Sequence, residues 1–130
     1  MVTRRFILAA ATYSICLPSC AELPFSSVGQ LKDSVSRLRA LIPVPESARI
    51  IGKMYFAVPS DAMEADALTR LILSSMSLDE GIIADLDQQE LSERVMSRIR
   101  DDFAQGLTVS AGGWILSQTE TRLCALWACP

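Results

Sequence analysis

Apolar side chains recur at steps of three and four residues along most of the chain, and this spacing gathers them on one face of an amphipathic helix. The clearest stripe lies between Asp87, which is suited to cap the start of a helix, and Gly106, which is suited to end one. Its members are Leu91, Val95, Met96, Ile99 and Phe103. We therefore predict a helix between Asp87 and Gly106.

Shorter stripes of the same spacing predict three helices earlier in the chain. Prolines separate them, because the proline ring takes the place of a backbone N–H donor and interrupts a helix. The predicted helices cover about residues 27–42, 46–58 with the apolar residues Ile50, Ile51, Met54 and Tyr55, and 61–76 with Ser60 or Asp61 as cap. After them, Ser77 and Glu80 have the spacing of a capping box, which predicts a short helical turn.

The pattern changes near residues 107–116, where two apolar segments flank Gly112 and Gly113. Two glycines suit the positive φ angles of a two-residue turn, so these segments predict an antiparallel β-hairpin in which Ala111 pairs with Trp114. Its apolar face then consists of Leu107, Val109, Ala111, Trp114 and Leu116. Because an isolated hairpin is marginal in water, we expect this face to lie on the helices with Trp114 as its anchor.

Ser117 and Glu120 have the spacing of a second capping box, which predicts a terminal helix bearing Leu123, Leu126 and Trp127. The predicted elements together describe a mainly α protein. We expect a small helical bundle of about five helices with one β-hairpin near residues 107–116. Residues 22–130 are expected to form this single domain.

The first 21 residues follow a different pattern. A short positive segment with Arg4 and Arg5 precedes the uncharged stretch 6–17, and small residues follow. This is the tripartite pattern of a cleaved secretory signal peptide, since the uncharged stretch is shorter than the roughly 20 residues that span a membrane. The segment Thr3-Arg4-Arg5-Phe6-Ile7-Leu8 resembles the twin-arginine signal, which implies export by the pathway that carries folded proteins. The general secretory route is the alternative, because paired arginines also suit an ordinary signal.

Two processing sites fit the end of this segment. Ser19 and Ala21 satisfy the small-x-small rule for a cut before Glu22. The segment 17–20 resembles a lipobox, which implies that Cys20 becomes an acylated N-terminus. A lipid there would tether the protein to a membrane surface without inserting its fold. We therefore expect a periplasmic or secreted protein, which the second processing site would anchor at Cys20.

The composition limits the chemistry that the chain can perform. Its 12 basic and 15 acidic residues give a formal net charge of −3, which argues against nucleic-acid binding. The chain has no histidine, so Ser-His-Asp and Cys-His nucleophiles, histidine zinc sites and histidine-ligated haem are excluded. The acidic residues between 79 and 90 lack the spacing of a calcium loop. We predict no catalytic residue, no metal site and no cofactor.

Cys124 and Cys129 are the two cysteines that follow the signal segment. A pair of cysteines in an oxidising compartment suggests a disulfide. Five residues along a helix separate the Cα atoms by about 8 Å, however, which exceeds the roughly 7 Å that a bridge tolerates. Three alternatives stay open: a bridge formed where the helix frays, a buried Cys124 with a free Cys129, and a bond to a partner protein.

These features favour an exported, non-catalytic accessory or binding protein of the bacterial cell envelope. In signal, size and helicity the chain is similar to the small subunits of periplasmic FAD-dependent sugar and alcohol dehydrogenases, which implies a subunit that escorts or docks on an oxidoreductase. The expected partners are the export machinery and one periplasmic protein. We expect Trp114, Leu126 and Trp127 at the docking surface, since aromatic residues are enriched in interface cores. The alternative is that both tryptophans belong to the core.

Three other functions compete with this hypothesis. They are a small periplasmic enzyme, a carboxylate metal-binding protein and a membrane-tethered structural lipoprotein. The mature N-terminus distinguishes the last of them, because a chain that begins at Glu22 has lost Cys20.

Overall fold

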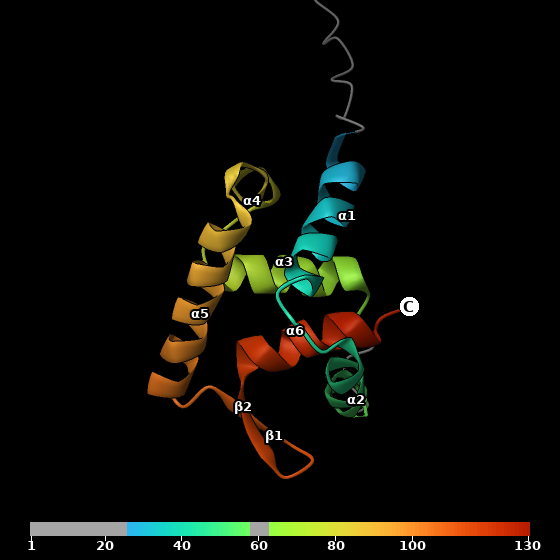
Figure 1. The fold of residues 1–130 in the computed structure, drawn as a ribbon, viewed down its shortest axis with the longest axis vertical. Helices are drawn as coiled ribbons and strands as arrows, with labels where there is room; N and C mark the ends of the chain where they lie inside the picture. Colours follow the sequence, from blue (N-terminus) through green and yellow to red (C-terminus); the bar gives the residue numbers. More distant parts are fainter. Residues whose placement is uncertain (1–25, 58–62) are drawn as a thin grey trace, which may run out of the picture.

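The computed structural model describes residues 26–57 and 63–130. The predicted signal segment with Arg4, Arg5 and Cys20 lies outside the described residues. The described elements are, in order, α1 (Ser26–Arg39), α2 (Pro45–Phe56), α3 (Ala65–Ser75), α4 (Glu80–Asp85), α5 (Gln88–Ala104), β1 (Thr108–Ala111), β2 (Trp114–Ser117) and α6 (Gln118–Ala128). The protein is therefore mainly α with one antiparallel hairpin, as predicted (Figure 1).

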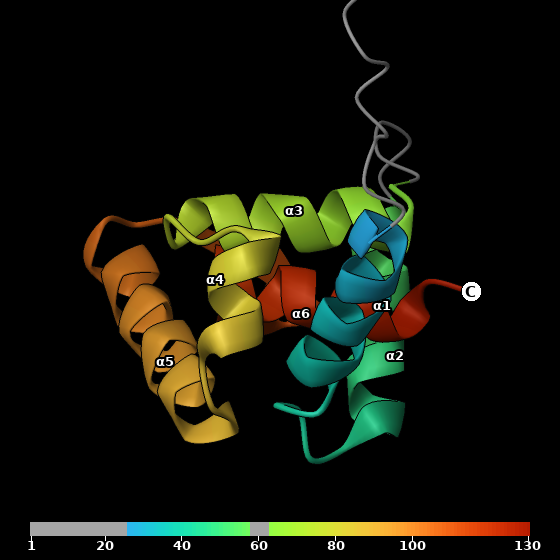
Figure 2. The ribbon, with the colours of Figure 1, turned by 90° about the horizontal axis from the view of Figure 1, so that it is seen from above.

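Helix α6 occupies the middle of the fold, where it contacts α1, α2, α3, α5 and both strands. Figure 1 shows α5 along one side of α6, while the hairpin projects from the end of the molecule opposite the start of α1. In the view of Figure 2, α3 runs along one side, and α1 and α4 lie next to each other beneath it. The Arg37 guanidinium joins α1 to α4 by donating to the carbonyls of Ile83 and Leu86.

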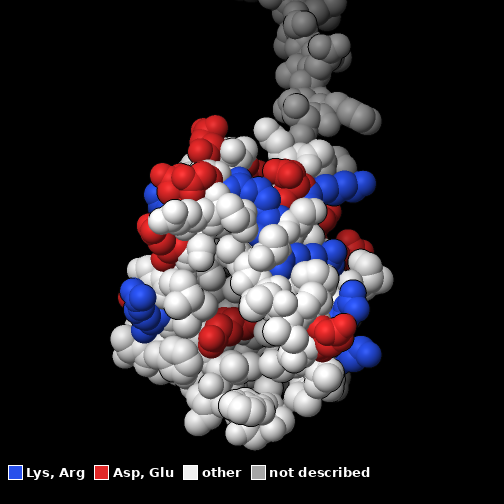
Figure 3. All heavy atoms as spheres, in the orientation of Figure 1, with Lys and Arg blue, Asp and Glu red and all other residues white. Residues whose placement is uncertain are grey.

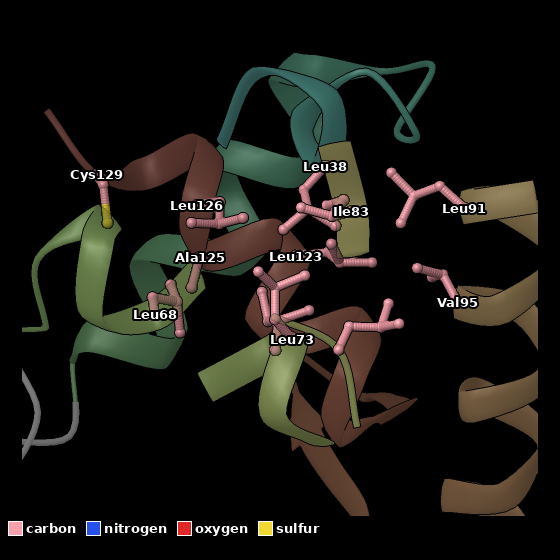
Figure 4. Packing of buried hydrophobic residues seen from close by; sticks show 12 residues of the cluster. Leu38, Leu68, Leu73, Ile83, Leu91, Val95, Leu123, Ala125, Leu126 and Cys129 are labelled. Atoms are coloured by element: carbon pink, nitrogen blue, oxygen red, sulfur yellow. The ribbon is translucent and has the colours of Figure 1, made fainter. Parts of the chain in front are cut away.

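The core forms where the helices converge on α6, and Figure 4 shows it from close by. Its fully buried aliphatic side chains come from five helices, which explains why no single stripe predicted it as a whole. They are Leu38, Leu68, Ile72, Leu73, Ile83, Leu91 and Leu126. From the predicted stripe of α5, Leu91 and Val95 are buried, whereas Met96 and Phe103 are exposed. The buried part of the α5 stripe is therefore narrower than the stripe of apolar residues in the sequence.

Helix α2 presents its small residues to α6. Ala48 and Gly52 are the buried residues of α2. A Cβ placed on Gly52 would lie 2.3 Å from the carbonyl oxygen of Cys124 and 2.8 Å from Cβ of Ala128. The two helices can therefore approach this closely only because position 52 has no side chain.

Three of the predicted helix boundaries are confirmed in detail. Asp87 and Glu90 form a capping box at the start of α5, and Ser117 forms another with Glu120 at the start of α6. Gly106 ends α5 with φ +72°, and the N–H of Leu107 reaches back to the carbonyl of Asp102 at 2.8 Å. This is a Schellman motif, which satisfies carbonyls at the end of a helix.

The caps predicted for the starts of α3 and α4 are wrong. Helix α3 begins at Ala65 with Glu64 at the N-cap position, so the caps predicted at residues 60 and 61, outside the described residues, do not serve it. Ser77 follows the end of α3 with φ +55°, and the N–H of Leu78 reaches back to Leu73 at 2.9 Å. Because Ser77 thus belongs to a Schellman ending, Asp79 caps α4 instead, accepting from the N–H of Ile82 at 2.8 Å.

Candidate docking surface

The hairpin has the predicted register, but Trp114 does not anchor it. Ala111 pairs with Trp114 and Val109 pairs with Leu116. The side chain of Trp114 is nevertheless 71% exposed, and that of its neighbour Ile115 is 69% exposed. The small side chain of Ala111 is buried in its place. The apolar face of the hairpin is thus present, but the helices leave it uncovered at Trp114.

An apolar groove of about 430 Å³ lies between this face of the hairpin and α2. Its helical wall has the spacing i, i+3, i+4, i+7, which marks one continuous stripe of a helix surface. The stripe consists of Ser47, Ile50, Ile51 and Met54. Ile50 is 59% exposed and Met54 41% exposed. Ile50 and Met54 therefore face the groove, because the small residues of α2 face α6, while Tyr55 packs against the core.

The groove lies at an end of the molecule that carries few charges. No residue from Phe103 to Thr119 is charged, and Figure 3 shows an almost entirely uncharged surface around the hairpin. Glu46 and Lys53 are exposed on α2 beside the stripe. Neither takes part in an ion pair with any described residue. An uncharged, aromatic centre with charges at the rim is typical of protein–protein interfaces.

The two other predicted docking residues belong to the fold. Leu126 is completely buried and offers no surface to a partner, so its prediction is wrong. Trp127 is partly buried, and its indole N–H donates to the carbonyl of Arg39 at 3.1 Å. The guanidinium groups of Arg39 and Arg49 lie 5.8 Å and 5.6 Å from its ring centroid. Trp127 thus joins α6 to α1 and α2, while the exposure of Trp114 contradicts a core position for both tryptophans.

Asp102 is a buried carboxylate whose importance the sequence did not reveal. It accepts from the backbone N–H of Thr119 at 2.8 Å and pairs with Arg98 at 2.7 Å, so it ties the end of α5 to the start of α6. Burial alone would raise the pKa of Asp102, but the hydrogen bonds from Thr119 and Arg98 and the charge of Arg98 hold it below its ordinary value of 3.8. The i, i+4 spacing of Arg98 and Asp102 is typical of an ion pair on a helix, whereas only the tertiary fold supplies Thr119.

Cys124 and Cys129 are both buried and both free in the structure. Cys124 lines a hollow of about 270 Å³ between α5 and α6. Burial, assisted by the charge of Glu120, raises the pKa of Cys124 to about 11. Burial also raises the pKa of Cys129, although the positive charge of Arg39 opposes this effect. Both groups are therefore thiols near neutral pH; their pairing after export stays a prediction.

Other features of the described chain do not form a site. No group of three or more Cys, Asp and Glu side chains in the described ranges is placed to hold a metal ion. No helix among residues 26–57 and 63–130 has the length and apolar character needed to cross a membrane. A hollow of about 550 Å³ is lined in part by Phe56, Met63 and Cys129, and we assign no site to it.

Comparison of the chain with models of protein families, with curated proteins and with solved structures finds no match. The groove between α2 and the hairpin is therefore interpreted from its own geometry and chemistry.

Proposed function

We propose that this chain is an exported, non-catalytic accessory or binding protein of the cell envelope, and that it docks on a protein partner through the groove between α2 and the hairpin. The observation that carries the proposal is the exposure of Trp114 beside the uncovered stripe of α2. Covering a large apolar side chain contributes about 1.5–3 kcal/mol. A protein partner that covers Trp114, Ile50 and Met54 would recover part of this contribution at each of them, because each is already partly covered.

The shape of the surface also supports a docking role. Ala111 and Gly112 at the hairpin turn and the side chain of Met54 all line the groove, so hairpin and helix form its two walls. Contiguous apolar surface with a polar rim marks interaction sites on soluble domains. The resemblance of signal, size and helicity to small dehydrogenase subunits makes the large subunit of a periplasmic oxidoreductase the partner class that we test first.

The export part of the proposal rests on the N-terminal pattern of Arg4, Arg5 and the uncharged residues 6–17. Replacing both arginines by lysine keeps the charge but removes the twin-arginine motif. We expect this variant to stay unprocessed if the twin-arginine route is used, and to be processed normally if the general secretory route is used. Mass spectrometry of the mature N-terminus distinguishes a start at Glu22 from an acylated Cys20.

Docking is tested by purifying the full chain from the cell envelope with a tag after Pro130. The groove variants Trp114→Ser and Ile50→Ser are compared with Ile82→Ser, which removes an exposed isoleucine on α4, a helix that contributes nothing to the groove. We expect a stoichiometric partner to be retained by the wild type and by Ile82→Ser and to be lost from both groove variants. The proposal fails if no stoichiometric partner is found or if all three variants retain it equally.

A further inference from the structure

We infer that a second copy of this chain covers the groove when no other partner does, by antiparallel pairing of the two α2 helices about a two-fold axis. This inference rests on the proposed function, because it takes the groove to be a protein-binding surface. The inference names the protein that occupies the groove, which is a second copy of this chain. Two observations point to that occupant: the distribution of charge along α2 and the shape of the surface next to it.

Two of the three charged residues of α2 are complementary to each other, whereas the third, Arg49, lies over the ring of Trp127. Ile50 lies near the middle of the stripe, with Glu46 four residues before it and Lys53 three residues after it. Both charged residues are therefore neighbours of Ile50 on the helix surface. If two α2 helices pack antiparallel with their axis of symmetry near Ile50, Glu46 of each copy lies opposite Lys53 of the second copy. The same operation forms both ion pairs, and both groups are exposed and unpaired within the described residues.

The apolar surface beside α2 is also complementary to itself. Each copy carries a hollow walled by Ile50 and Met54 and, beside it, the projecting indole of Trp114. In a two-fold arrangement, the same surface of both copies meets, so the stripe and the indole of each copy face those of the other. Interfaces of this isologous kind are by far the commonest in homo-oligomers. A net charge of −3 for the whole chain disfavours the anionic lipid surface that would be the competing occupant.

Charge exchange within α2 tests this arrangement. Sedimentation equilibrium of the purified, processed protein is measured over a concentration series at low ionic strength. We expect a dimer whose dissociation constant rises roughly tenfold in Glu46→Lys and in Lys53→Glu, because each change turns two attractive pairs into two repulsive ones. The double variant Glu46→Lys/Lys53→Glu restores both pairs in an antiparallel dimer, so its dissociation constant should return to within about threefold of the wild type.

Two controls complete the experiment. Glu93→Lys makes the same charge change on an exposed face of α5 and should leave the dissociation constant unchanged. Circular dichroism verifies that each variant is folded. Added salt should weaken the wild-type dimer and strengthen the dimers of the single variants, since it screens attraction and repulsion alike.

Several results would overturn the inference. The inference is wrong if the wild type is monomeric over the whole concentration series. It is also wrong if the double variant dimerises more weakly than either single variant. If the wild type is monomeric but Trp114→Ser loses a co-purified partner, the second copy is wrong and the proposed docking function stands. If the dimer forms as described but no other protein is retained, the second copy is supported and the accessory function fails.

Discussion

Replacement of Gly52 by alanine tests whether the close approach of α2 and α6 holds the groove wall in place. The new Cβ would lie 2.3 Å from the carbonyl oxygen of Cys124, a backbone atom that cannot rotate away. Ordinary contacts of a Cβ atom begin at about 3.4 Å. Helix α2 must therefore move outward by about 1 Å, which loosens its packing against α6 near Cys124 and Ala128.

The magnitude follows from two opposing contributions. Forcing extra atoms into a packed interface costs about 1–3 kcal/mol, and a clash with backbone favours the upper end of that range. Alanine in place of glycine inside a helix contributes about 1 kcal/mol of stability. We therefore expect Gly52→Ala to lose about 2 kcal/mol of unfolding free energy, which lowers the Tm of a domain of this size by about 8–16 °C.

Gly29 provides the matched control, because it lies in α1 and a Cβ placed there meets no atom within 4 Å. Gly29→Ala should show the propensity gain alone, about 0.5–1 kcal/mol. Urea denaturation followed by circular dichroism measures both variants under identical conditions. If Gly52→Ala is as stable as the wild type, or if the two variants shift in the same direction, the packing argument is refuted.

Three further predictions concern individual side chains. The pKa of Asp102 is lower in the folded than in the unfolded chain, so the carboxylate stabilises the fold above about pH 4 and loses this contribution as the pH falls through the folded pKa. Asp102→Asn should therefore be less stable than the wild type at pH 7 and approach the stability of the wild type in acid. Urea denaturation at both pH values measures this difference. Ser77→Gly should raise the unfolding free energy by about 1 kcal/mol in urea denaturation, since glycine adopts φ +55° without strain. If Ser77 instead capped α4, the same change would lower the unfolding free energy by about 1 kcal/mol. The thiol of Cys124, with a pKa of about 11, should react with an aromatic disulfide at pH 8 only after unfolding in denaturant, and fast labelling of the native protein that is lost in Cys124→Ser would contradict this.

Local signals predicted those boundaries that depend on a few neighbouring residues. The caps at Asp87 and Ser117 need only a side chain and a glutamate three positions later, and the hairpin register needs only the turn at Gly112. The local rule fails at Ser77. Its spacing to Glu80 satisfies the same rule, but the ending of α3 uses Ser77 for another purpose, and Asp79 is also a good cap. Local rules therefore find candidate caps, while competition between adjacent helices decides among them.

Tertiary packing accounts for what the sequence could not predict. Ile50 and Met54 have the spacing of a buried helix face, and yet α6 contacts the side of α2 that bears Gly52, because the smallest residues permit the closest approach. Asp102 looks like half of an exposed ion pair with Arg98 until the start of α6 arrives to donate a backbone N–H to it. Both features have one physical origin. A periodic pattern shows which residues lie on a common face, and it does not show which face another element will cover.

Trp114 is the clearest case of a residue whose face is predictable and whose burial is not. Its place on the apolar face of the hairpin follows from the register, and it is the same whether that face is covered by the chain's own helices or by another chain. The helices leave Trp114 exposed because Ala111 alone makes the buried contact there, while the stripe of α2 faces the remaining gap. Two uncovered apolar walls from separate elements would each be costly in a chain that works alone. Their convergence on one groove among the described residues is the reason for our proposal that a protein partner covers it.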